Sequence, residues 1–359
     1  MSAPPSIRDR RELTTNTTVA NAEKGKTALM ERLMPAQWLK ETERGLQQSF
    51  RFRGLAVLLI LLIVGYCAWA WDEGPNRFPA PAMTVALRAE RIAIDPAGVA
   101  PLRLVGAWRL TADDRRFGGL SALATDRGRL LAMSDSGVAF RFSPPGLGDG
   151  RVAIADVGDG PGSPLLKQNR DSESLARDPY GRGWWVGYEG RNTVWLYDRG
   201  FRRRLGSIEF GKKRWPRNVG IEAMLADRGH LILLPEGGGE LVDVAQGQAR
   251  PSPLRGTDSR ISDTVRLPDG TVLVLLREVG LSGFRTALGV LTKDDGGWTI
   301  TRRVPLDLGP FANAEGLAVQ PLGQGATRLW VVTDDNFQPP LTTMLFALDL
   351  PPGGWPGKN

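Results

Sequence analysis

The chain has 359 residues, and its 44 glycines, 26 prolines and 11 tryptophans favour a turn-rich body of strands. A single cysteine and a single histidine exclude an intrachain disulfide and zinc sites built from those two residue types. The formal net charge of +7 is dispersed: residues 1–71 hold 10 basic and 6 acidic residues, and the remainder holds 36 and 33. No basic surface is concentrated enough to predict binding to nucleic acid.

The N-terminal stretch predicts a membrane anchor. Residues 1–53 form a polar tail of mixed charge, which we expect to be cytoplasmic and partly disordered. Residues 54–71 carry no charge, and at about 1.5 Å rise per residue they reach about 27 Å, enough for a transmembrane helix. Arg51 and Arg53 precede this run, and two acidic residues follow it. The positive-inside rule therefore predicts a single-pass signal-anchor, with the rest of the chain on the extracytoplasmic (periplasmic) side of the cell membrane.

Two other interpretations of the uncharged run stay open. Ala68-Trp69-Ala70 has the small-x-small form of a cleavage site, which would make the run a cleavable signal peptide. A buried core helix is the other alternative. Mass spectrometry of the membrane-bound protein distinguishes cleavage from anchoring by the mature N-terminus. Residues 72–101 are rich in proline and alanine, and we expect them to be a linker.

Five segments of the remaining chain repeat one pattern: a polar opening residue, an apolar strand, a turn, a second apolar strand and an acidic residue. The turns are of the Asp-x-Gly and Pro-Asp-Gly kind, which supply the positive-φ positions that hairpins require. Periods of 40–50 residues with several strands each indicate β-propeller blades. The opening residues have spacings of 52, 49, 41 and 52 positions, and they are Ser121, Glu173, Glu222, Asp263 and Glu315.

The fold expected from these repeats is an all-β propeller of five or six blades over residues 102–350. Outer strands such as Val194–Asp198 fill the space between the repeats. Met344–Asp349 and Leu102–Gly106 are expected to share one blade and so to close the ring, which removes exposed strand edges. Residues 351–359 are left as a C-terminal tail.

The repeats resemble the successive motifs of the phytase-like family, described by the phrase "esterase-like activity of phytase". The resemblance covers about residues 102–350 and implies a β-propeller, with ester hydrolysis as the associated activity. This sequence departs from the family in its long tail and anchor and in Ser172. The motifs are Gly118-Gly119-Leu120-Ser121 with Ser134-Asp135, Asp171-x-Glu173-Ser-Leu-Ala, Asn218-x-Gly220-Ile221-Glu222-Ala223, and Asn313-Ala-Glu315-Gly-Leu-Ala with Thr333-Asp334-Asp335-Asn336-Phe337.

Carboxylates are the main candidates for a site. In each hairpin the start of the first strand faces the end of the second, so the opening and closing acids meet. If these hairpins are the innermost ones of successive blades, their acids converge on one mouth of the channel. The ring predicted in this way consists of Asp135, Glu173, Glu189, Glu222, Glu236, Asp263, Glu278, Glu315, Asp334 and Asp335.

Such crowding of carboxylates favours a bound cation, and Ca²⁺ prefers six to eight oxygen ligands. We expect the metal to be held by Glu173, Glu222, Glu315 and Asp334. Nearby basic residues would bind an anionic ester, and these are Lys167, Arg170, Arg217, Arg277 and Arg285. A metal-activated water can attack an ester without a histidine.

The sequence thus predicts a membrane-anchored phytase-like propeller that acts as a metal-dependent hydrolase of phosphoric or carboxylic esters. The alternative is a non-catalytic propeller that binds a protein or an envelope glycan, with carboxylates that only cap strands and pair with arginines. Ser121 and Ser134 are weaker nucleophile candidates, because no Gly-x-Ser-x-Gly elbow surrounds either. His230 is expected to be an exposed residue at a strand entry.

Overall fold

The computed structural model describes residues 57–62, 79–211, 215, 220–227, 229–256 and 258–356. The chain divides into two units, Met1–Asp72 and Glu73–Asn359. In the first unit, residues 57–62 are helical. Within the described ranges, no helix has both the length and the apolar character needed to cross a membrane. The transmembrane helix predicted over residues 54–71 falls largely outside these ranges and stays a prediction.

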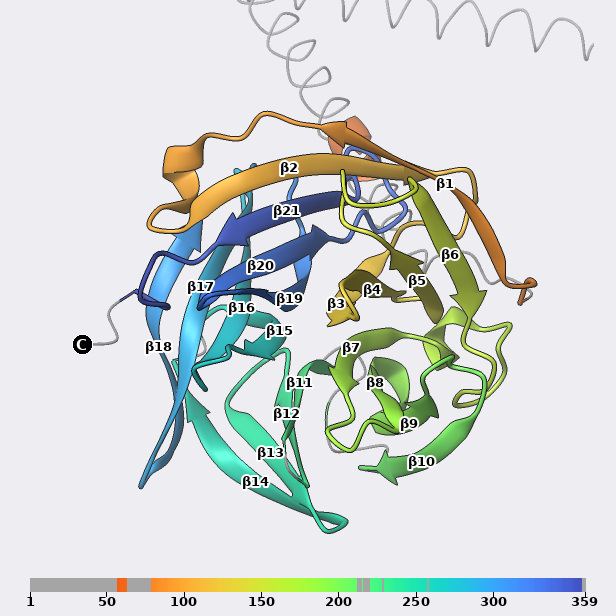
Figure 1. The fold of residues 1–359 in the computed structure, drawn as a ribbon. Helices are drawn as coiled ribbons and strands as arrows, with labels where there is room; N and C mark the ends of the chain where they lie inside the picture. Colours follow the sequence, from red (N-terminus) through yellow and green to blue (C-terminus); the bar gives the residue numbers. More distant parts are fainter. Residues whose placement is uncertain are drawn as a thin grey trace, which may run out of the picture. The chain divides into compact units, whose positions relative to one another are not determined.

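The second unit is built almost entirely of strands, which confirms the all-β prediction (Figure 1). The only helical segments in its described part are short 3₁₀ turns, η1 (Pro96–Val99), η2 (Lys167–Asn169) and η3 (Glu189–Arg191). The strands are β1 (Met83–Arg91), β2 (Arg103–Ala112), β3 (Leu120–Asp126), β4 (Arg129–Ser134), β5 (Val138–Phe142), β6 (Arg151–Asp156), β7 (Ser172–Arg177), β8 (Gly183–Tyr188), β9 (Thr193–Asp198), β10 (Arg204–Glu209), β11 (Ile221–Asp227), β12 (His230–Pro235), β13 (Glu240–Ala245), β14 (Gln248–Arg255), β15 (Arg260–Arg266), β16 (Val272–Gly280), β17 (Gly283–Asp294), β18 (Gly297–Leu306), β19 (Ala314–Gly323), β20 (Ala326–Thr333) and β21 (Met344–Asp349).

These strands pair in antiparallel groups of four around a ring (Figure 1). The first four groups are consecutive along the chain: β3–β6, β7–β10, β11–β14 and β15–β18. The closing group consists of β19, β20, β21 and β2. The innermost strands β3, β7, β11, β15 and β19 each contact the next, and β19 contacts β3, so they form a closed circle.

The closing group joins the two ends of the body, as the sequence predicts. β2 pairs antiparallel with β21, in a register that sets Ala107 opposite Phe346. The outer edges of several groups are also covered. β1 pairs with both β2 and β6, and β14 pairs in parallel with β18. Such pairing protects backbone groups that would otherwise be exposed at a sheet edge.

Two boundaries differ from the prediction. The stretch expected to be a linker, residues 72–101, contains β1, whose alternating Val85 and Leu87 are partly buried against the first and closing groups. Its proline- and alanine-rich surroundings mask this short alternation in the sequence. The tail after residue 350 is also not detached, because Trp355 is 2% exposed within the core between the fourth and closing groups.

The core consists of apolar layers between neighbouring groups. Successive side chains of a strand point to opposite faces, so one strand contributes to both of its interfaces. In β12, Leu233 packs toward the second group and Leu234 toward the fourth. Trp184 packs between the first and second groups and Trp330 between the closing and first groups, each 1% exposed. The tryptophans therefore serve packing between groups, and the ring holds its inner strands at fixed positions around the axis.

Candidate functional site: a mouth of bulged strands

Each innermost strand has an irregularity near its start, and in four of the five repeats it falls on the polar opening residue. The pairing register shifts by one residue there, as between Ile221 and Ala223 in β11, so the residue between them has no partner of its own. Such a β-bulge bends the strand and redirects a side chain. The five bulge residues are Ser121, Glu173, Glu222, Ser262 and Glu315.

A second layer lies at the ends of the adjacent strands. The backbone N–H of Asp135 donates to Gly119 O at 2.9 Å, and that of Glu189 donates to Asp171 O at the same distance. Equivalent bonds run from Glu236 to Gly220 and from Asp334 to Asn313. In the fourth group the equivalent position is held by Arg277, which lies opposite Arg260 in the antiparallel pairing of β15 and β16. We call the end of the ring where these two layers meet the mouth.

The fourth repeat corrects the predicted ring. Ser262, and not Asp263, is its bulge residue, and Arg277, and not Glu278, closes its hairpin. Asp263 lies one residue further along the strand, where it accepts hydrogen bonds from the N–H of Leu317 at 2.6 Å and from that of Thr264 at 2.7 Å. Burial raises the pKa of Asp263 well above its usual value in spite of these donors. The Asp263 carboxylate therefore links the innermost strands β15 and β19.

Glu278 lies apart from the mouth. Its carboxylate accepts from Ser259 Oγ at 2.7 Å and pairs with Arg285 at 2.8 Å. These partners, Ser259 first, lower the pKa of Glu278, and its side chain is 39% exposed. Glu278 is one position beyond Arg277, and because successive side chains of a strand point to opposite faces, the two side chains point away from each other.

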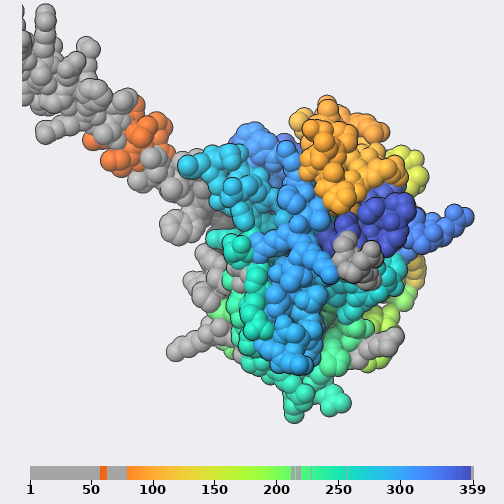
Figure 2. All heavy atoms as spheres, turned by 90° about the vertical axis from the view of Figure 1, so that its left-hand side faces the viewer, coloured from red at the N-terminus to blue at the C-terminus, as the bar shows by residue number. Residues whose placement is uncertain are grey.

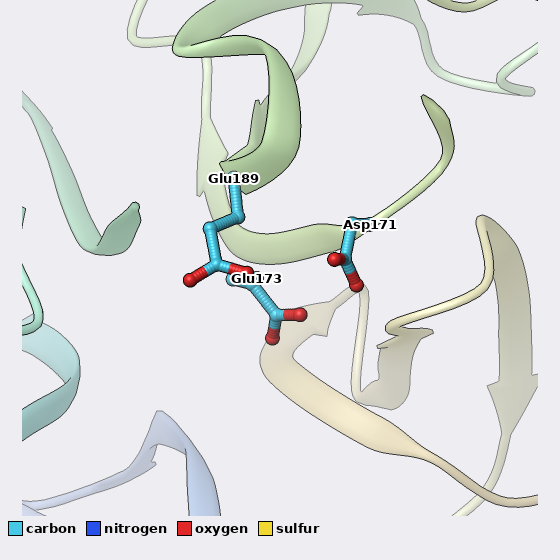
Figure 3. A group of neighbouring side chains, drawn as sticks. All are labelled: Asp171, Glu173 and Glu189. Carbon is cyan, nitrogen blue, oxygen red and sulfur yellow. The ribbon is translucent and has the colours of Figure 1, made fainter. Parts of the chain in front are cut away.

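The densest group of carboxylates comes from the second group of strands (Figure 3). Asp171 precedes β7, Glu173 lies in β7, and Glu189 follows β8; one oxygen from each lies within 4.8 Å of the others. Gly220 permits this approach, because a Cβ there would lie 2.1 Å from Cγ of Glu189. Its N–H donates to Glu189 Oε1 at 3.3 Å. Together with Glu222, these residues form what we call the acidic sector.

Positive charge compensates the acidic sector only in part. Lys167 donates to Asp171 Oδ1 at 2.8 Å and lies 3.1 Å from Asp135 Oδ2. Among the described residues, no hydrogen bond or ion pair reaches the carboxylates of Glu173 and Glu222. Glu222 is nonetheless only 8% exposed.

The electrostatics reflect this crowding. Burial raises the pKa of Glu173 well above its usual value, and the charges of Glu222, Asp171 and Glu189 raise it further. Burial and the neighbouring Glu236 act in the same way on the pKa of Glu222. Burial, followed by Asp171, raises the pKa of Glu189 to about 7. A carboxyl whose charged form is disfavoured holds a proton or attracts a cation.

On the opposite side of the mouth, arginine side chains offset the negative charge of the carboxylates. Arg277 donates to Glu236 Oε1 at 3.3 Å and pairs with Glu315, and Arg260 donates to Glu236 Oε1 at 2.6 Å. Burial alone would lower the pKa of Arg277, but the charges of Glu315, Glu222 and Glu236 raise it instead. Asn313 completes this arrangement, since its Nδ2 donates to Glu315 Oε1 at 2.9 Å. Arg260, Arg277 and Ser262 form what we call the arginine sector.

The remaining predicted acids have mixed surroundings. Burial raises the pKa of Asp135 to about 6, against the opposing charge of Lys167. Burial and Glu315 raise the pKa of Asp334, whose Oδ1 accepts from the N–H of Asn336 at 2.6 Å. Asp335 accepts from the N–H of Gly119 at 2.8 Å and from Thr343 Oγ1 at 2.9 Å, which fixes the closing group against the first. Asp335 therefore has a structural role in these hydrogen bonds.

The predicted anion-binding residues are not gathered together. Lys167 and Arg277 lie at the mouth but pair with carboxylates. Arg170 is 6% exposed and donates to Pro161 O at 3.4 Å, whereas Arg285 is exposed beside Glu278. Arg217 falls outside the described residues.

Sequence reasoning missed several members of the mouth. Asp171 belongs to the second motif, but it precedes the strand and is therefore not an opening residue of the repeat. Arg260, Ser262 and Asn313 are not among the predicted site residues. Their signal is positional, since each occupies the place that an acid or glycine holds in another repeat.

Comparison with known families identifies the fold. The profile of the family described as "Phytase-like: Esterase-like activity of phytase" matches residues 115–337, more than half of the chain. The chain belongs to the phytase-like family. The match spans the first four groups and the first two strands of the closing group, so it includes every bulge residue of this phytase-like body. No curated protein matches the sequence.

Solved structures resemble the phytase-like body only distantly. Glutaminyl cyclase from Myxococcus xanthus is 15% identical, with a TM-score of 0.45 over 69% of this chain and 95% of its own. Hydrazine synthase from Kuenenia stuttgartiensis is 13% identical, with a TM-score of 0.36 over 66% and 68%. The WD40 repeats of RRP9 are 9% identical, with a TM-score of 0.37 over 75% and 100%. None of these similarities supports a functional argument.

Proposed function

We propose that the mouth binds a divalent cation, Ca²⁺ in the first place, and that this phytase-like protein hydrolyses anionic phosphoric or carboxylic esters there. The observation that carries the proposal is the cluster of Asp171, Glu173 and Glu189, with one oxygen from each within 4.8 Å of the others. Carboxylate oxygens are the ligands that Ca²⁺ prefers. The predicted metal set shares Glu173 with this cluster, and Glu222 lies in the same sector.

The donor set fits a hard cation. Oxygens that share one Ca²⁺ lie about 2.3–2.6 Å from the ion, so ligand oxygens less than 5 Å apart can reach it together. Glu173 has no hydrogen bond among the described residues, which leaves its oxygens available. Lys167 occupies Asp171 Oδ1 and reduces the net negative charge, which favours moderate affinity. Glu315 and Asp334, predicted as ligands, are instead held by Arg277 and by the N–H of Asn336.

The protein's own residues supply the other steps of ester hydrolysis. A bound divalent cation polarises an ester oxygen and offsets developing negative charge. In the cation-free protein, burial and Asp171 raise the pKa of Glu189 to about 7, so binding of the cation near neutral pH would release a proton from this carboxyl. On the opposite side of the mouth, Arg277 and Asn313 donate to Glu315, and Arg277 supplies positive charge that favours an anionic ester. Neither step requires a histidine.

The test is hydrolysis of phosphomonoesters and acyl esters by the full chain, with Ca²⁺ and with a chelator, beside calorimetric titration of Ca²⁺. We expect Ca²⁺-dependent turnover that Glu173→Gln lowers at least tenfold. Glu278→Gln is the matched control, because Glu278 is an acid outside the mouth, and it should retain activity. Absence of both calcium binding and turnover under all conditions would contradict the proposal.

A second candidate function is binding without catalysis. The pairing of Glu236, Glu315 and Arg277 favours it, because paired acids and bases are also what a purely structural ring contains. In this case the mouth presents its face to a protein or an envelope glycan. The double variant Glu222→Gln/Glu315→Gln distinguishes the candidates: a change in stability alone, with no effect on turnover or calcium affinity, favours binding.

We further propose that each four-stranded group is one blade, which gives a five-bladed propeller. The closed circle of innermost strands supports this count. We also propose that residues 54–71 anchor the protein in the cell membrane, with the body on the periplasmic side, on the grounds of the uncharged run and its flanking charges. Retention in membranes after alkaline carbonate extraction is the expected result.

A further inference from the structure

The hairpin between β16 and β17 ends in an exposed apolar tip. Leu281 is fully exposed, at 113% of the reference area, and Val279 is 67% exposed. Phe311, 52% exposed, lies on the adjoining segment, which is held to the hairpin by a bond from Phe284 N–H to Pro310 O at 3.0 Å. Exposed apolar side chains grouped in this way mark an interaction surface. We call Val279, Leu281 and Phe311 the apolar tip.

The apolar tip lies on the mouth face of the ring. Arg277, a mouth residue, belongs to the same strand β16, and Leu281 follows four positions later. At about 3.3 Å per residue, the tip extends about 13 Å beyond the level of Arg277. Figure 2 shows the hairpin in cyan, standing out at the upper left of the body. At the mouth itself, Glu222 and Glu236 are only 8% and 6% exposed, in contrast to the exposed tip.

The chain also enters the body on this face. The N–H of Ala80 donates to Asp156 Oδ2 at 2.8 Å, and Arg116 donates to Pro81 O at 3.3 Å. Asp156 ends β6 opposite Val138, the first residue after the mouth turn of the first group. The entry point is therefore at the mouth end of the strands.

The entry point lies close in sequence to the uncharged run. Eight residues separate Trp71 from Ala80. At about 3.3–3.6 Å per residue they span at most about 30 Å. A tether of this length keeps the mouth face at high effective concentration beside any membrane that holds the run.

We propose that the apolar tip inserts into the lipid bilayer that holds the chain, so that the mouth faces the lipid headgroups. This inference rests on the proposed anchor and goes beyond the proposed cation site. Apolar side chains at the tip enter the boundary between headgroups and acyl chains, as interfacial segments do. Arg285 at the base of the hairpin has a side chain that is 68% exposed, and its guanidinium suits headgroup phosphates. An ester presented by the membrane surface would then reach the mouth directly.

The test uses the full chain reconstituted in lipid nanodiscs. Cys67, the only cysteine, is replaced by serine, and Leu281→Cys carries an environment-sensitive fluorophore. We expect blue-shifted emission and quenching by lipids that carry a nitroxide at a shallow acyl position. The matched control is Leu147→Cys, a 69%-exposed leucine in the turn between β5 and β6, at the opposite end of the strands. Its probe should stay in water and escape quenching.

Every outcome bears on the proposal. Equal, water-like emission from both positions overturns it. Blue-shifted emission at position 281 without quenching by lipid also overturns it, since the tip then contacts protein. Carbonate extraction tests the anchor separately, and calcium titration of the Leu281→Asp variant tests the cation site. If the bilayer model holds, that variant loses quenching, and Ca²⁺ affinity changes less than twofold.

Discussion

The two sides of the mouth are built from the same repeat but differ in charge compensation. On the acidic sector, Glu222 is buried and Glu173 is half-buried, and neither carboxylate has a partner among the described residues. On the arginine sector, Arg277 replaces an acid and pairs with the carboxylates of Glu236 and Glu315. The repeat therefore fixes where the side chains of the mouth lie, and the identity of each residue decides whether the charge there is compensated. On one side the buried carboxylates are paired with arginine, and on the other side the negative charge is left for a ligand to satisfy.

The largest expected effect comes from breaking the compensated side. Arg277→Met leaves Glu236 and Glu315 buried and without Arg277, which should lower the free energy of unfolding by about 3–5 kcal/mol. Urea unfolding followed by tryptophan fluorescence measures the change. Arg285→Met removes an exposed arginine from a surface pair and should cost less than about 1 kcal/mol. Equal effects of the two substitutions would contradict the comparison.

The pH dependence of stability tests the difference between the two sectors from the acidic side. Because the pKa of Glu189 is raised from 4.5 to about 7 by burial and by Asp171, the folded state holds a proton that the unfolded state releases. The cation-free protein should therefore lose stability as pH rises between about 4.5 and 7, by on the order of 2–3 kcal/mol. Denaturant midpoints at pH 5 and pH 8 measure it, and Glu189→Gln should flatten the slope. A midpoint that rises with pH would refute the crowding of the acidic sector.

Removal of one uncompensated charge should stabilise the protein. Without calcium at pH 8, Glu173→Gln relieves repulsion from Glu222 and Asp171 and is expected to add about 1–2 kcal/mol to the free energy of unfolding. Saturating Ca²⁺ should stabilise the wild type and leave this variant little changed. Thermal melts with and without calcium provide the measurement. A destabilised variant would mean that Glu173 has a structural partner.

The smallest effect concerns the two serines at bulge positions. Ser121 Oγ donates to Ser172 O at 2.5 Å, whereas Ser262 Oγ is buried without a partner in the described part of the chain. Ser121→Ala should cost about 1 kcal/mol, and Ser262→Ala should cost less than about 0.5 kcal/mol. Calorimetric melting of both variants measures the two losses in stability. A larger loss for Ser262→Ala than for Ser121→Ala would contradict this prediction.

Much of this architecture could be predicted from the sequence. The apolar alternation and the Asp-x-Gly turns gave the hairpins, and the matching of Leu102–Gly106 with Met344–Asp349 gave the closure. Both signals depend on local chemistry, on strand periodicity and on positive-φ turn residues. The propeller-type body follows from their regular spacing.

The site was predicted less accurately, for a physical reason. In the fourth repeat the mouth positions belong to Ser262 and Arg277, and the acids that fit the sequence pattern, Asp263 and Glu278, lie one position further along each strand. Which acids pair with which bases also depends on distances across the ring, which spacing along the chain does not encode. Asp171 joins the cluster through such a distance and not through its place in a strand.

The closing group has a consequence for how the protein is made. Arg103 in β2 and its partner Asp349 in β21 lie 246 positions apart. At synthesis rates of about 5–20 residues per second, β2 waits about 12–50 s for β21 to appear. During that interval the ring is open, and the edges of β2 and β20 that β21 will join are unpaired. The growing chain therefore exposes an unpaired strand edge until β21 is made, and any early termination before β21 removes the closing strand along with the tail.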